Sequence, residues 1–434
     1  MKKVAFITLG CKVNQYETNA MIQEFLRKGY EVIESNQKAD IYVINTCTVT
    51  NMSDRKSRQM LRRVKELNEK SIVVACGCYV QVAKEEIEKI DEIDLLLGNN
   101  EKNKIVENIE EYLEKQQKQV LIEDVMSQKE FLDFGNITYT EKTRAVIKVQ
   151  DGCDRFCSYC IIPYARGRVR SRKAQSIISE IKKISEQGIK EVVITGIHIA
   201  SYGKDFKEEY KLIDLLEEIN KIEGIERIRL GSIEPLIITE EFVSRLSKLQ
   251  KVCHHFHLSL QSGCNQTLKR MNRRYTTEDF EKIVKRLRNF YNDVILTTDI
   301  IVGFPQETEE EFEETYKFLE KIKFYKMHVF KYSPRKGTKA STLQGQVDGK
   351  IKEQRSQKLI QLSDKNEKDY NKDYIGKEVE VLFEEEKNGY YQGHTDNYIL
   401  ALCKTDISLE NKLVKVRCTG VSKNSIIVEI MNVI

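Results

Sequence analysis

Short apolar segments alternate with amphipathic ones over the first 120 residues of the chain. The predicted strands cover residues 4–9, 40–45 and 71–75, and the predicted helices cover residues 14–28 and 53–68. Strands that alternate with helices are typical of a parallel sheet covered by helices. We therefore predict an α/β domain over residues 1–120, followed by a polar linker over residues 121–139.

The same alternation returns between residues 140 and 345. The predicted strands cover residues 144–150, 190–195, 226–230, 254–260, 293–302 and 324–330. Six strands are too few for a closed eight-stranded barrel, so we predict a partial (β/α)6 barrel. An active site in such a barrel lies at the carboxyl edge of its strands.

The pattern changes again after residue 345. Residues 346–370 are strongly charged and predict a connecting helix. Polar and apolar residues then alternate at 378–383, 398–402 and 413–417, with glycines between these runs. Alternation with a period of two predicts a small antiparallel β-barrel over residues 371–434.

Composition narrows the class of protein. The chain has 434 residues, of which 40% are hydrophobic and 32% charged, as in soluble globular proteins. No apolar run is long enough to cross a bilayer, so we expect no membrane partner and a cytoplasmic location. Eleven cysteines in such a protein favour metal or redox chemistry over disulfides.

Three of the cysteines, Cys153, Cys157 and Cys160, lie close together with the spacing C-x3-C-x2-C. Three thiolates can hold three irons of a [4Fe–4S] cluster and leave the fourth iron open to a small molecule. A structural zinc site takes four ligands, so zinc would need a distant His or Cys to complete its shell. The spacing favours the cluster and leaves the zinc site as the alternative.

Further cysteines follow the predicted strands of the first domain: Cys11, Cys47, Cys76 and Cys78. Loops that leave the carboxyl edge of a parallel sheet converge on one crevice, so thiols far apart in sequence can meet there. The alternative is a set of ordinary buried core cysteines.

Basic residues form two groups close to these motifs. They are Arg166, Arg168, Arg170, Arg172 and Lys173 in the first group and Lys269, Arg270, Arg273 and Arg274 in the second. An isolated run of charges is usually a solvated face, but the position next to the cysteine loop favours contact with phosphate.

The stretch from Asp151 to Gly167 resembles the radical S-adenosylmethionine (SAM) enzymes, whose C-x3-C-x2-C loop follows the first strand of a barrel. The resemblance implies that Cys153, Cys157 and Cys160 are catalytic cluster ligands and that the open iron chelates SAM. Reductive cleavage of SAM then gives a 5′-deoxyadenosyl radical, while the protein binds and shields the reacting groups.

Nearly the whole chain resembles the methylthiotransferases of that superfamily. The matching stretches are Thr8-Leu-Gly-Cys-Lys-Val-Asn14, Asn45-Thr-Cys47 and Gly77-Cys-Tyr-Val-Gln81, together with the Asp151–Gly167 stretch. The resemblance implies a second [4Fe–4S] cluster on Cys11, Cys47 and Cys78, with Cys76 as a competitor for the third position. It also implies that the carboxyl-terminal barrel is a TRAM domain.

The barrel loops at 195–203, 229–235 and 257–263 look like those of the subfamily that acts on N6-threonylcarbamoyladenosine at tRNA position 37. This resemblance implies methylthiolation at C2 of that nucleoside, with SAM as both methyl donor and radical source. It also implies tRNA (the anticodon stem–loop), a flavodoxin or ferredoxin as reductant, and a sulfur donor as partners. Candidate SAM-binding residues in strand-end loops are Gly196, Ser232, Glu234, Gln261, Arg274 and Asp299.

Two other functions remain open from the sequence. A methylthiotransferase of the same architecture could act on another modified adenosine or on a ribosomal-protein aspartate. A non-catalytic iron–sulfur nucleic-acid binder would need no SAM site, so the barrel loops argue against it.

Residues 371–434 hold eight Lys or Arg against ten Asp or Glu, which is not the charge pattern of an RNA-binding surface.

Overall fold

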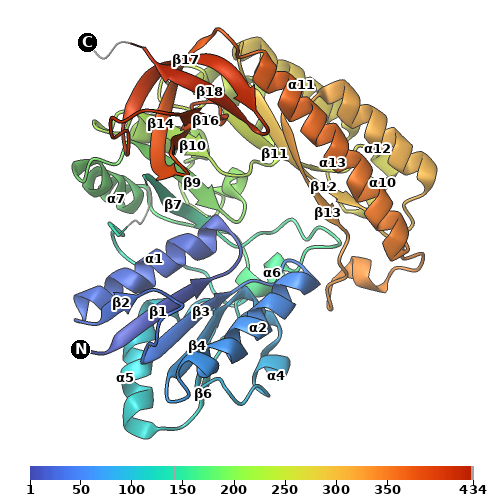
Figure 1. Cartoon of the computed structure of the whole chain (residues 1–434). Helices are drawn as coiled ribbons and strands as arrows, with labels where there is room; N and C mark the ends of the chain where they lie inside the picture. The colour runs from blue at the N-terminus through green and yellow to red at the C-terminus, as the bar shows by residue number, and fades with distance from the viewer. Residues whose placement is uncertain (140–142, 432–434) are drawn as a thin grey trace.

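The computed structural model describes residues 1–139 and 143–431, and its chain forms three units (Figure 1). The first is a six-stranded, entirely parallel sheet in the order β2-β1-β3-β4-β5-β6. Its strands are β1 (Lys3–Thr8), β2 (Glu31–Ile33), β3 (Ile41–Thr46), β4 (Ile72–Gly77), β5 (Leu95–Leu97) and β6 (Gln119–Leu121). The predicted parallel sheet is confirmed, and β2, β5 and β6 are additional strands of three residues each.

Helices cover both faces of this sheet. They are α1 (Lys12–Arg27), α2 (Asn51–Leu67), α3 (Cys78–Val82), α4 (Lys84–Ile87) and α5 (Ile105–Lys115), with the short 3-10 helix η1 (Lys102–Lys104). Met21 and Phe25 of α1 pack with α5 on one face, and Leu61 and Val64 of α2 pack with α3 and α4 on the other. The loops between strands and helices therefore gather at the carboxyl edge of the sheet.

The second unit is the predicted partial barrel. Its six parallel strands are β7 (Arg144–Asp151), β9 (Glu191–Gly196), β10 (Arg227–Leu230), β11 (His255–Gln261), β12 (Ile295–Val302) and β13 (Lys326–Lys331). The two-residue strand β8 (Arg170–Ser171) pairs antiparallel with β7. The sheets β10-β9-β7-β8 and β11-β12-β13 meet through isolated bridges at Ile228–Val252 and Ile233–Leu258.

Helices surround the outside of the barrel. They are α6 (Ile162–Arg166), α7 (Ala174–Glu186), α8 (Leu212–Asn220), α9 (Glu240–Leu246), α10 (Asn265–Arg270), α11 (Thr277–Phe290) and α12 (Glu309–Ile322), with η2 (Ile199–Ser201), η3 (Pro235–Ile237) and η4 (Lys339–Thr342). Outward-facing residues such as Ile147, Ile194 and Leu258 pack against these helices in the largest apolar core. The alternate positions of the strands therefore face the barrel interior, where many of them are polar.

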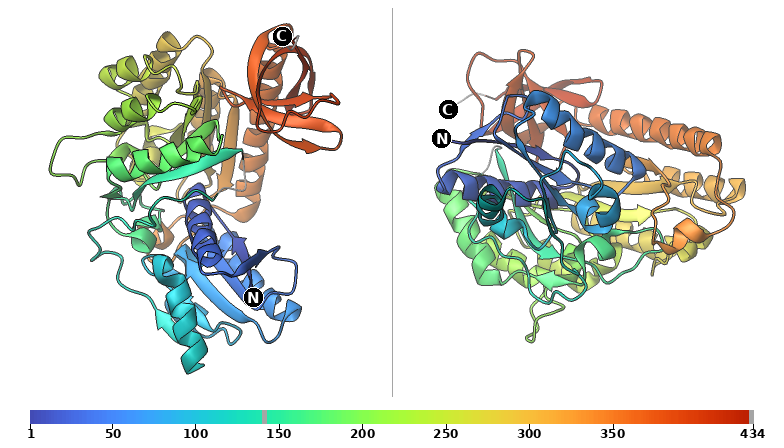
Figure 2. Two further views of the ribbon diagram at one scale, coloured as in Figure 1. Left: turned by 90° about the vertical axis from the view of Figure 1, so that its left-hand side faces the viewer. Right: turned by 90° about the horizontal axis from the view of Figure 1, so that it is seen from below.

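A long helix, α13 (Gly349–Lys372), leads to the third unit. This is a closed barrel in the order β14-β15-β16-β18-β17, built from β14 (Glu378–Lys387), β15 (Tyr390–Thr395), β16 (Leu400–Cys403), β17 (Leu413–Ser422) and β18 (Ser425–Ile430). Figure 2 shows this barrel beside α13 and the central strands. Arg227 and Arg229 fix it there by donating to the carbonyl oxygens of His394 and Asp396, at 2.9 and 2.8 Å.

The first unit closes the open side of the partial barrel. Helix α1 lies against β7 and β9, and the Tyr16 hydroxyl donates to the Glu180 carboxylate at 3.1 Å (Figure 1). Residues 122–139 of the predicted linker contain no helix or strand, while residue 121 is the last residue of β6. The linker follows α1 through hydrogen bonds to Gln23. Among the described residues, no helix is both long and apolar enough to cross a membrane.

Candidate functional site

The loop after β7 brings Cys153, Cys157 and Cys160 together. The Cys153 amide donates to the Gly167 carbonyl at 3.0 Å, and the Cys160 amide donates to the Cys157 carbonyl at 2.9 Å. Gly152 begins the loop at a φ of +71°, where a Cβ would lie 1.8 Å from the Arg168 carbonyl oxygen. Only glycine fits this position, so the backbone holds the loop in one shape.

Burial and neighbouring thiols change the pKa values of Cys153 and Cys160. Burial raises the pKa of Cys153 to about 11, with the nearby Cys157 thiol contributing. Burial also raises the pKa of Cys160 to about 12, with contributions from Cys157 and Cys153. Buried thiols of this kind lose their protons when a metal binds them, because the metal stabilises the thiolates.

A second triad forms at the carboxyl edge of the amino-terminal sheet. Cys11 precedes α1, Cys47 follows β3, and Cys78 is the first residue of α3 after β4. Burial raises the pKa of Cys47 to about 11, and the thiols of Cys78 and Cys11 lie close enough to contribute. Three strand ends thus deliver three thiols to one place, as the strand-end positions predict.

Cys76, in contrast, lies inside the amino-terminal sheet. It is fully buried within β4 and packs in the apolar core with Val43, Met21 and Ile109. A ligand there would have to turn out of the core, whereas Cys78 sits at the carboxyl edge. The structure therefore favours Cys78 as the third thiol of the triad.

Gly10 provides a test of this triad that leaves the cysteines intact. A Cβ on Gly10 would lie 2.7 Å from Cys47 Sγ, at a φ of +100°. We expect Gly10→Ala to displace Cys47 and to lower the iron retained by the amino-terminal triad. Gly29→Ala is the control, since Gly29 has a φ of +81° with no atom within 4 Å of the added Cβ. Equal iron contents in the two purified variants would contradict the arrangement.

A buried network of charges connects the two triads. Arg166 Nε donates to Cys78 Sγ at 3.3 Å, and its terminal nitrogens donate to Glu17 at 2.6 Å and to Asp151 at 3.2 Å. Asp151 lies two residues before Cys153. The Lys148 ammonium bridges Glu17 and Asp151 at 2.7 and 2.6 Å. Arg166 thus spans the space from one triad to the loop of the other.

This network carries more positive than negative charge. Lys102, Lys148, Arg166 and Arg170 face only Glu17 and Asp151, and all six side chains are at most 5% exposed. Buried charge without a partner is costly, so the network favours an anionic group beside Cys78. An iron–sulfur cluster held by thiolates fits that requirement.

Arg273 contacts the triad of Cys153, Cys157 and Cys160, as Arg166 contacts the amino-terminal triad. It donates to Cys157 Sγ at 3.4 Å and to the Ser259 carbonyl at 2.8 Å. Hydrogen bonds to cluster sulfurs are among the interactions that set reduction potentials. Both triads therefore have the three thiols and the cationic donor that a [4Fe–4S] cluster with an open iron requires.

The predicted SAM-binding residues lie around the barrel mouth, at different depths. Glu234 is buried and accepts an ion pair from Arg155 of the cysteine loop. Burial raises the pKa of Glu234, but His198, Arg155 and Arg273 outweigh this effect and lower it overall. Gln261 ends β11 at a φ of +72°, and Gly196 ends β9.

Ser232 and Asp299 lie deeper, and Arg274 lies outside. Ser232 and Asp299 line an internal cavity, and the Asp299 carboxylate is 3.1 Å from His257 Nε2. Arg274 is exposed, while the neighbouring Arg273 contacts the cysteine loop. Arg273 is therefore the arginine that contacts the cysteine loop, and a role of Arg274 in SAM binding stays a prediction.

That cavity, of about 520 Å³, lies in the barrel interior between all three units. Its lining is polar and basic: Lys12 of α1; Arg229, Ser232, His255, His257, Thr297, Asp299, Lys326 and His328 of the barrel; Glu367 of α13; and His394, Tyr398 and Asn424 of the carboxyl-terminal barrel, with a few further residues. Lys12 directly follows Cys11. Lys12 therefore connects the cavity to the amino-terminal unit, while none of the six cysteines of the two triads is among the residues that line it.

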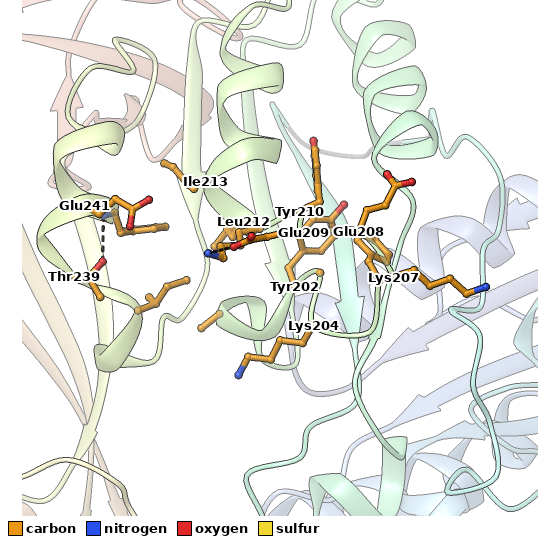
Figure 3. Close-up of a pocket in the computed structure, with 16 residues that line it drawn as sticks. Tyr202, Lys204, Lys207, Glu208, Glu209, Tyr210, Leu212, Ile213, Thr239 and Glu241 are labelled. Carbon is orange, nitrogen blue, oxygen red and sulfur yellow. Dashed lines mark hydrogen bonds and ion pairs between the residues drawn. The ribbon is translucent and has the colours of Figure 1, made fainter.

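A second cavity, of about 510 Å³, lies under the loop between β9 and α8 (Figure 3). Tyr202 packs edge to face against Phe206 and Tyr210 there, and lysines and glutamates surround these rings. It contains none of the predicted site residues, so we do not assign the chemistry to it.

Three of the five basic residues after the cysteine loop are buried and so are not available as phosphate contacts. Arg166, Arg170 and Arg172 are at most 2% exposed and bind groups within the protein. Arg172, for example, lies 2.9 Å from the carboxylate of Glu180. These three arginines join the amino-terminal unit to the barrel, and only Arg168 and Lys173 of this group are exposed.

Comparison with protein families gives two matches. Residues 147–319 match the model of the Radical SAM superfamily, and residues 3–98 match that of the Uncharacterized protein family UPF0004. The first includes the three cysteines after β7, and the second includes Cys11, Cys47 and Cys78.

Curated proteins are similar over nearly the whole chain. The Bacillus subtilis protein "Threonylcarbamoyladenosine tRNA methylthiotransferase MtaB" is 42% identical over 96% of this chain and 94% of its own length. The Aquifex aeolicus protein of the same name is 44% identical over 92% of this chain and 95% of its own length. An Alkaliphilus oremlandii "tRNA-2-methylthio-N(6)-dimethylallyladenosine synthase" is 34% identical over 99% of this chain and 93% of its own length.

Solved structures show the same fold at low sequence identity. The radical S-adenosylmethionine methyltransferase TsrM from Kitasatospora setae superposes with a TM-score of 0.57 at 15% identity, over 76% of this chain and 73% of that one. The cobalamin-dependent radical enzyme OxsB superposes with a TM-score of 0.52 at 16% identity, over 85% of this chain and 56% of that one.

Proposed function

The chain belongs to the radical-SAM methylthiotransferases that modify tRNA, and from this premise we propose that it methylthiolates C2 of N6-threonylcarbamoyladenosine at tRNA position 37. The observation that carries the proposal is the pair of cysteine triads joined through Arg166, together with a cavity lined by histidines, lysines and an arginine.

Two cluster sites match the chemistry of this reaction. C2 of adenine bears a C–H bond that acid–base catalysis cannot open, because it has no acidic proton and no leaving group. When bound, a cluster on Cys153, Cys157 and Cys160 supplies radical chemistry with SAM, and one on Cys11, Cys47 and Cys78 supplies the sulfur that becomes methylated and transferred.

The residues of the chain position and shield these groups. Arg166 and Lys148 hold the amino-terminal unit against the end of β7, which fixes the distance between the triads. Glu234 and Arg155 pair across the barrel mouth and position the cysteine loop. Helix α1 packs against β7 and β9 and so shields one side of the barrel, where a carbon radical would otherwise react with other groups.

The cavity favours one nucleoside over another. A threonylcarbamoyl group carries a urea, a hydroxyl and a carboxylate, whereas a dimethylallyl group is a hydrocarbon. Four histidines, two lysines and an arginine line the cavity. Most of them already have partners, but Lys12 has no acidic partner among the described residues. A hydrocarbon group would leave Lys12 unpaired, while a carboxylate would pair with it.

We propose the anticodon stem–loop of tRNA as the partner that brings the base to the cavity. A flavodoxin or ferredoxin would reduce the clusters, and a separate sulfur donor would restore the transferred sulfur. These partners place the enzyme in the cytoplasm, where tRNA is modified. In this scheme the closed five-stranded barrel at the carboxyl end is the TRAM domain.

Turnover by the reconstituted enzyme tests the proposal. With dithionite, SAM and a tRNA that carries N6-threonylcarbamoyladenosine, we expect the methylthiolated nucleoside, with 5′-deoxyadenosine and S-adenosylhomocysteine in similar amounts. A tRNA that carries the dimethylallyl group should give no methylthio product. Modification of the dimethylallyl tRNA alone would show that the substrate assignment is wrong.

A further inference from the structure

Lys12 is the basic side chain in the cavity that has no acidic partner among the described residues. Arg229 pairs with Glu191 at 2.7 Å, and Lys326 pairs with Glu367 at 2.9 Å. The Lys12 side chain extends into an open cavity. It is therefore exposed to solvent even though protein atoms lie around it. Its ammonium is therefore available to a ligand.

The neighbours of Lys12 leave a positive charge to be balanced. The guanidinium groups of Arg144 and Arg229 and the carboxylate of Glu191 lie close enough to Lys12 to interact with its ammonium. Arg144 is committed to Glu384 at 2.8 Å, and Glu191 is shared between Arg144 and Arg229. An anion is thus the ligand that this end of the cavity would bind.

A second polar atom in the same cavity also has no partner. His255 is 6% exposed; its Nε2 bonds Thr297 Oγ1 at 3.0 Å, but Nδ1 has no hydrogen-bond partner among the described residues. Lys12 lies close enough to help lower the pKa of His255 well below its usual value. The imidazole is therefore neutral, but its Nδ1 has almost no accessible surface, so His255 shapes the wall of the cavity beside the lysine.

The covalent structure of the substrate relates these groups to the reaction. C2 and the carbon that bears N6 both flank N1 of adenine, so a substituent on N6 lies a few bonds from C2. C2 must approach sulfur held at the triad of Cys11, and Lys12 is the next residue along the chain. A carboxylate attached through N6 would then reach the cavity beside Lys12.

We propose that Lys12 binds the threonylcarbamoyl group in this cavity by pairing with its carboxylate, with His255 forming part of the cavity wall. This inference rests on the proposed function and adds the residue that recognises the substrate. A carboxylate in a partly enclosed site gains a charge-assisted hydrogen bond there that an unmodified adenosine does not make.

Binding to the reconstituted holoenzyme tests the site. The probes are anticodon stem–loop RNAs with N6-threonylcarbamoyladenosine, its methyl ester or unmodified adenosine at position 37. We expect the wild type to prefer the free carboxylate about tenfold or more over the other two RNAs. Lys12→Gln should remove this preference without weakening binding of the unmodified RNA, and Lys12→Arg should keep most of it.

Lys326→Gln is the matched control, because Lys326 lines the same cavity but is already paired. It should keep the preference for the carboxylate. Equal weakening of all three RNAs by Lys12→Gln would show that Lys12 binds a backbone phosphate and would overturn the proposal, as would an unchanged preference. Failure of the proposed function would instead appear as no methylthiolated product from the wild type.

Discussion

Replacing Cys78 by alanine is expected to abolish methylthiolation while leaving the reductive cleavage of SAM intact. The variant loses a ligand of the amino-terminal triad and should contain about four irons per chain instead of about eight. The triad of Cys153, Cys157 and Cys160 lies on a separate loop, so 5′-deoxyadenosine should still form. Iron analysis and product analysis of the purified, reconstituted variant measure both effects.

Cys76→Ala is the matched control for this experiment. Cys76 is two residues away but is buried in the core of the sheet, and its replacement removes one small side chain there. We expect this variant to keep its iron and its methylthiolation activity, with at most a modest loss of stability. If Cys76→Ala loses the cluster and Cys78→Ala keeps it, the ligand assignment is wrong.

The second large effect is expected from Glu17→Gln. Glu17 is fully buried and accepts from Lys102, Lys148 and Arg166, so its neutral replacement leaves four cations facing Asp151 alone. Removing one partner of a buried ionic network costs about 3–5 kcal/mol. Chemical unfolding of the amino-terminal unit should therefore begin at clearly lower denaturant concentration.

Glu111→Gln controls for the loss of a carboxylate as such. Glu111 pairs with Lys115 on the exposed face of α5, where such pairs contribute little. This variant should unfold like the wild type, and a similar shift in both variants would contradict the importance of the buried network.

The contribution of Glu17 to the stability of the fold changes with pH in a defined direction. Burial alone would raise its pKa, but Arg166, Lys102 and Lys148 together hold the pKa well below its usual value. The stability that Glu17 contributes is therefore present above its unfolded-state pKa, about 4.3, and is lost as the pH falls toward its folded-state pKa. Wild type and Glu17→Gln should accordingly become more similar in stability in acid.

The order of strands and helices could be predicted from the sequence because each long strand carries apolar residues on its outward face. Ile147, Ile194 and Leu258 illustrate this, and all six barrel strands lie within a few residues of their predicted positions. Strands β2, β5 and β6 were not predicted, because three residues are too few to show a period. The strands β15 and β18 of the last barrel were missed as well.

The roles of the arginines could not be predicted, because their partners lie far away in the sequence. Arg166 binds Glu17 and Arg172 binds Glu180, and nothing near either arginine indicates a buried ion pair. A run of basic residues has the same sequence pattern whether its side chains face solvent or the protein interior. The cysteines were easier to place because strand ends of a parallel sheet meet at one edge.

The role proposed for Lys12 in substrate binding could not be predicted from the sequence either. Its position after Cys11 is plain in the sequence, but the cavity that it lines comes from three units separated by hundreds of residues. Only the assembled chain shows that Arg229 and Lys326 are paired while Lys12 is not.

Mass spectrometry of tRNA nucleosides tests the central claim most directly. The samples are cells that lack the gene, the same cells carrying the wild-type gene, and the same cells carrying Cys153→Ala. We predict that 2-methylthio-N6-threonylcarbamoyladenosine disappears on deletion, its unthiolated precursor accumulates, and only the wild-type gene restores it. An unchanged level of this nucleoside in deleted cells that contain no second enzyme of this activity would contradict the assignment and direct attention to ribosomal proteins.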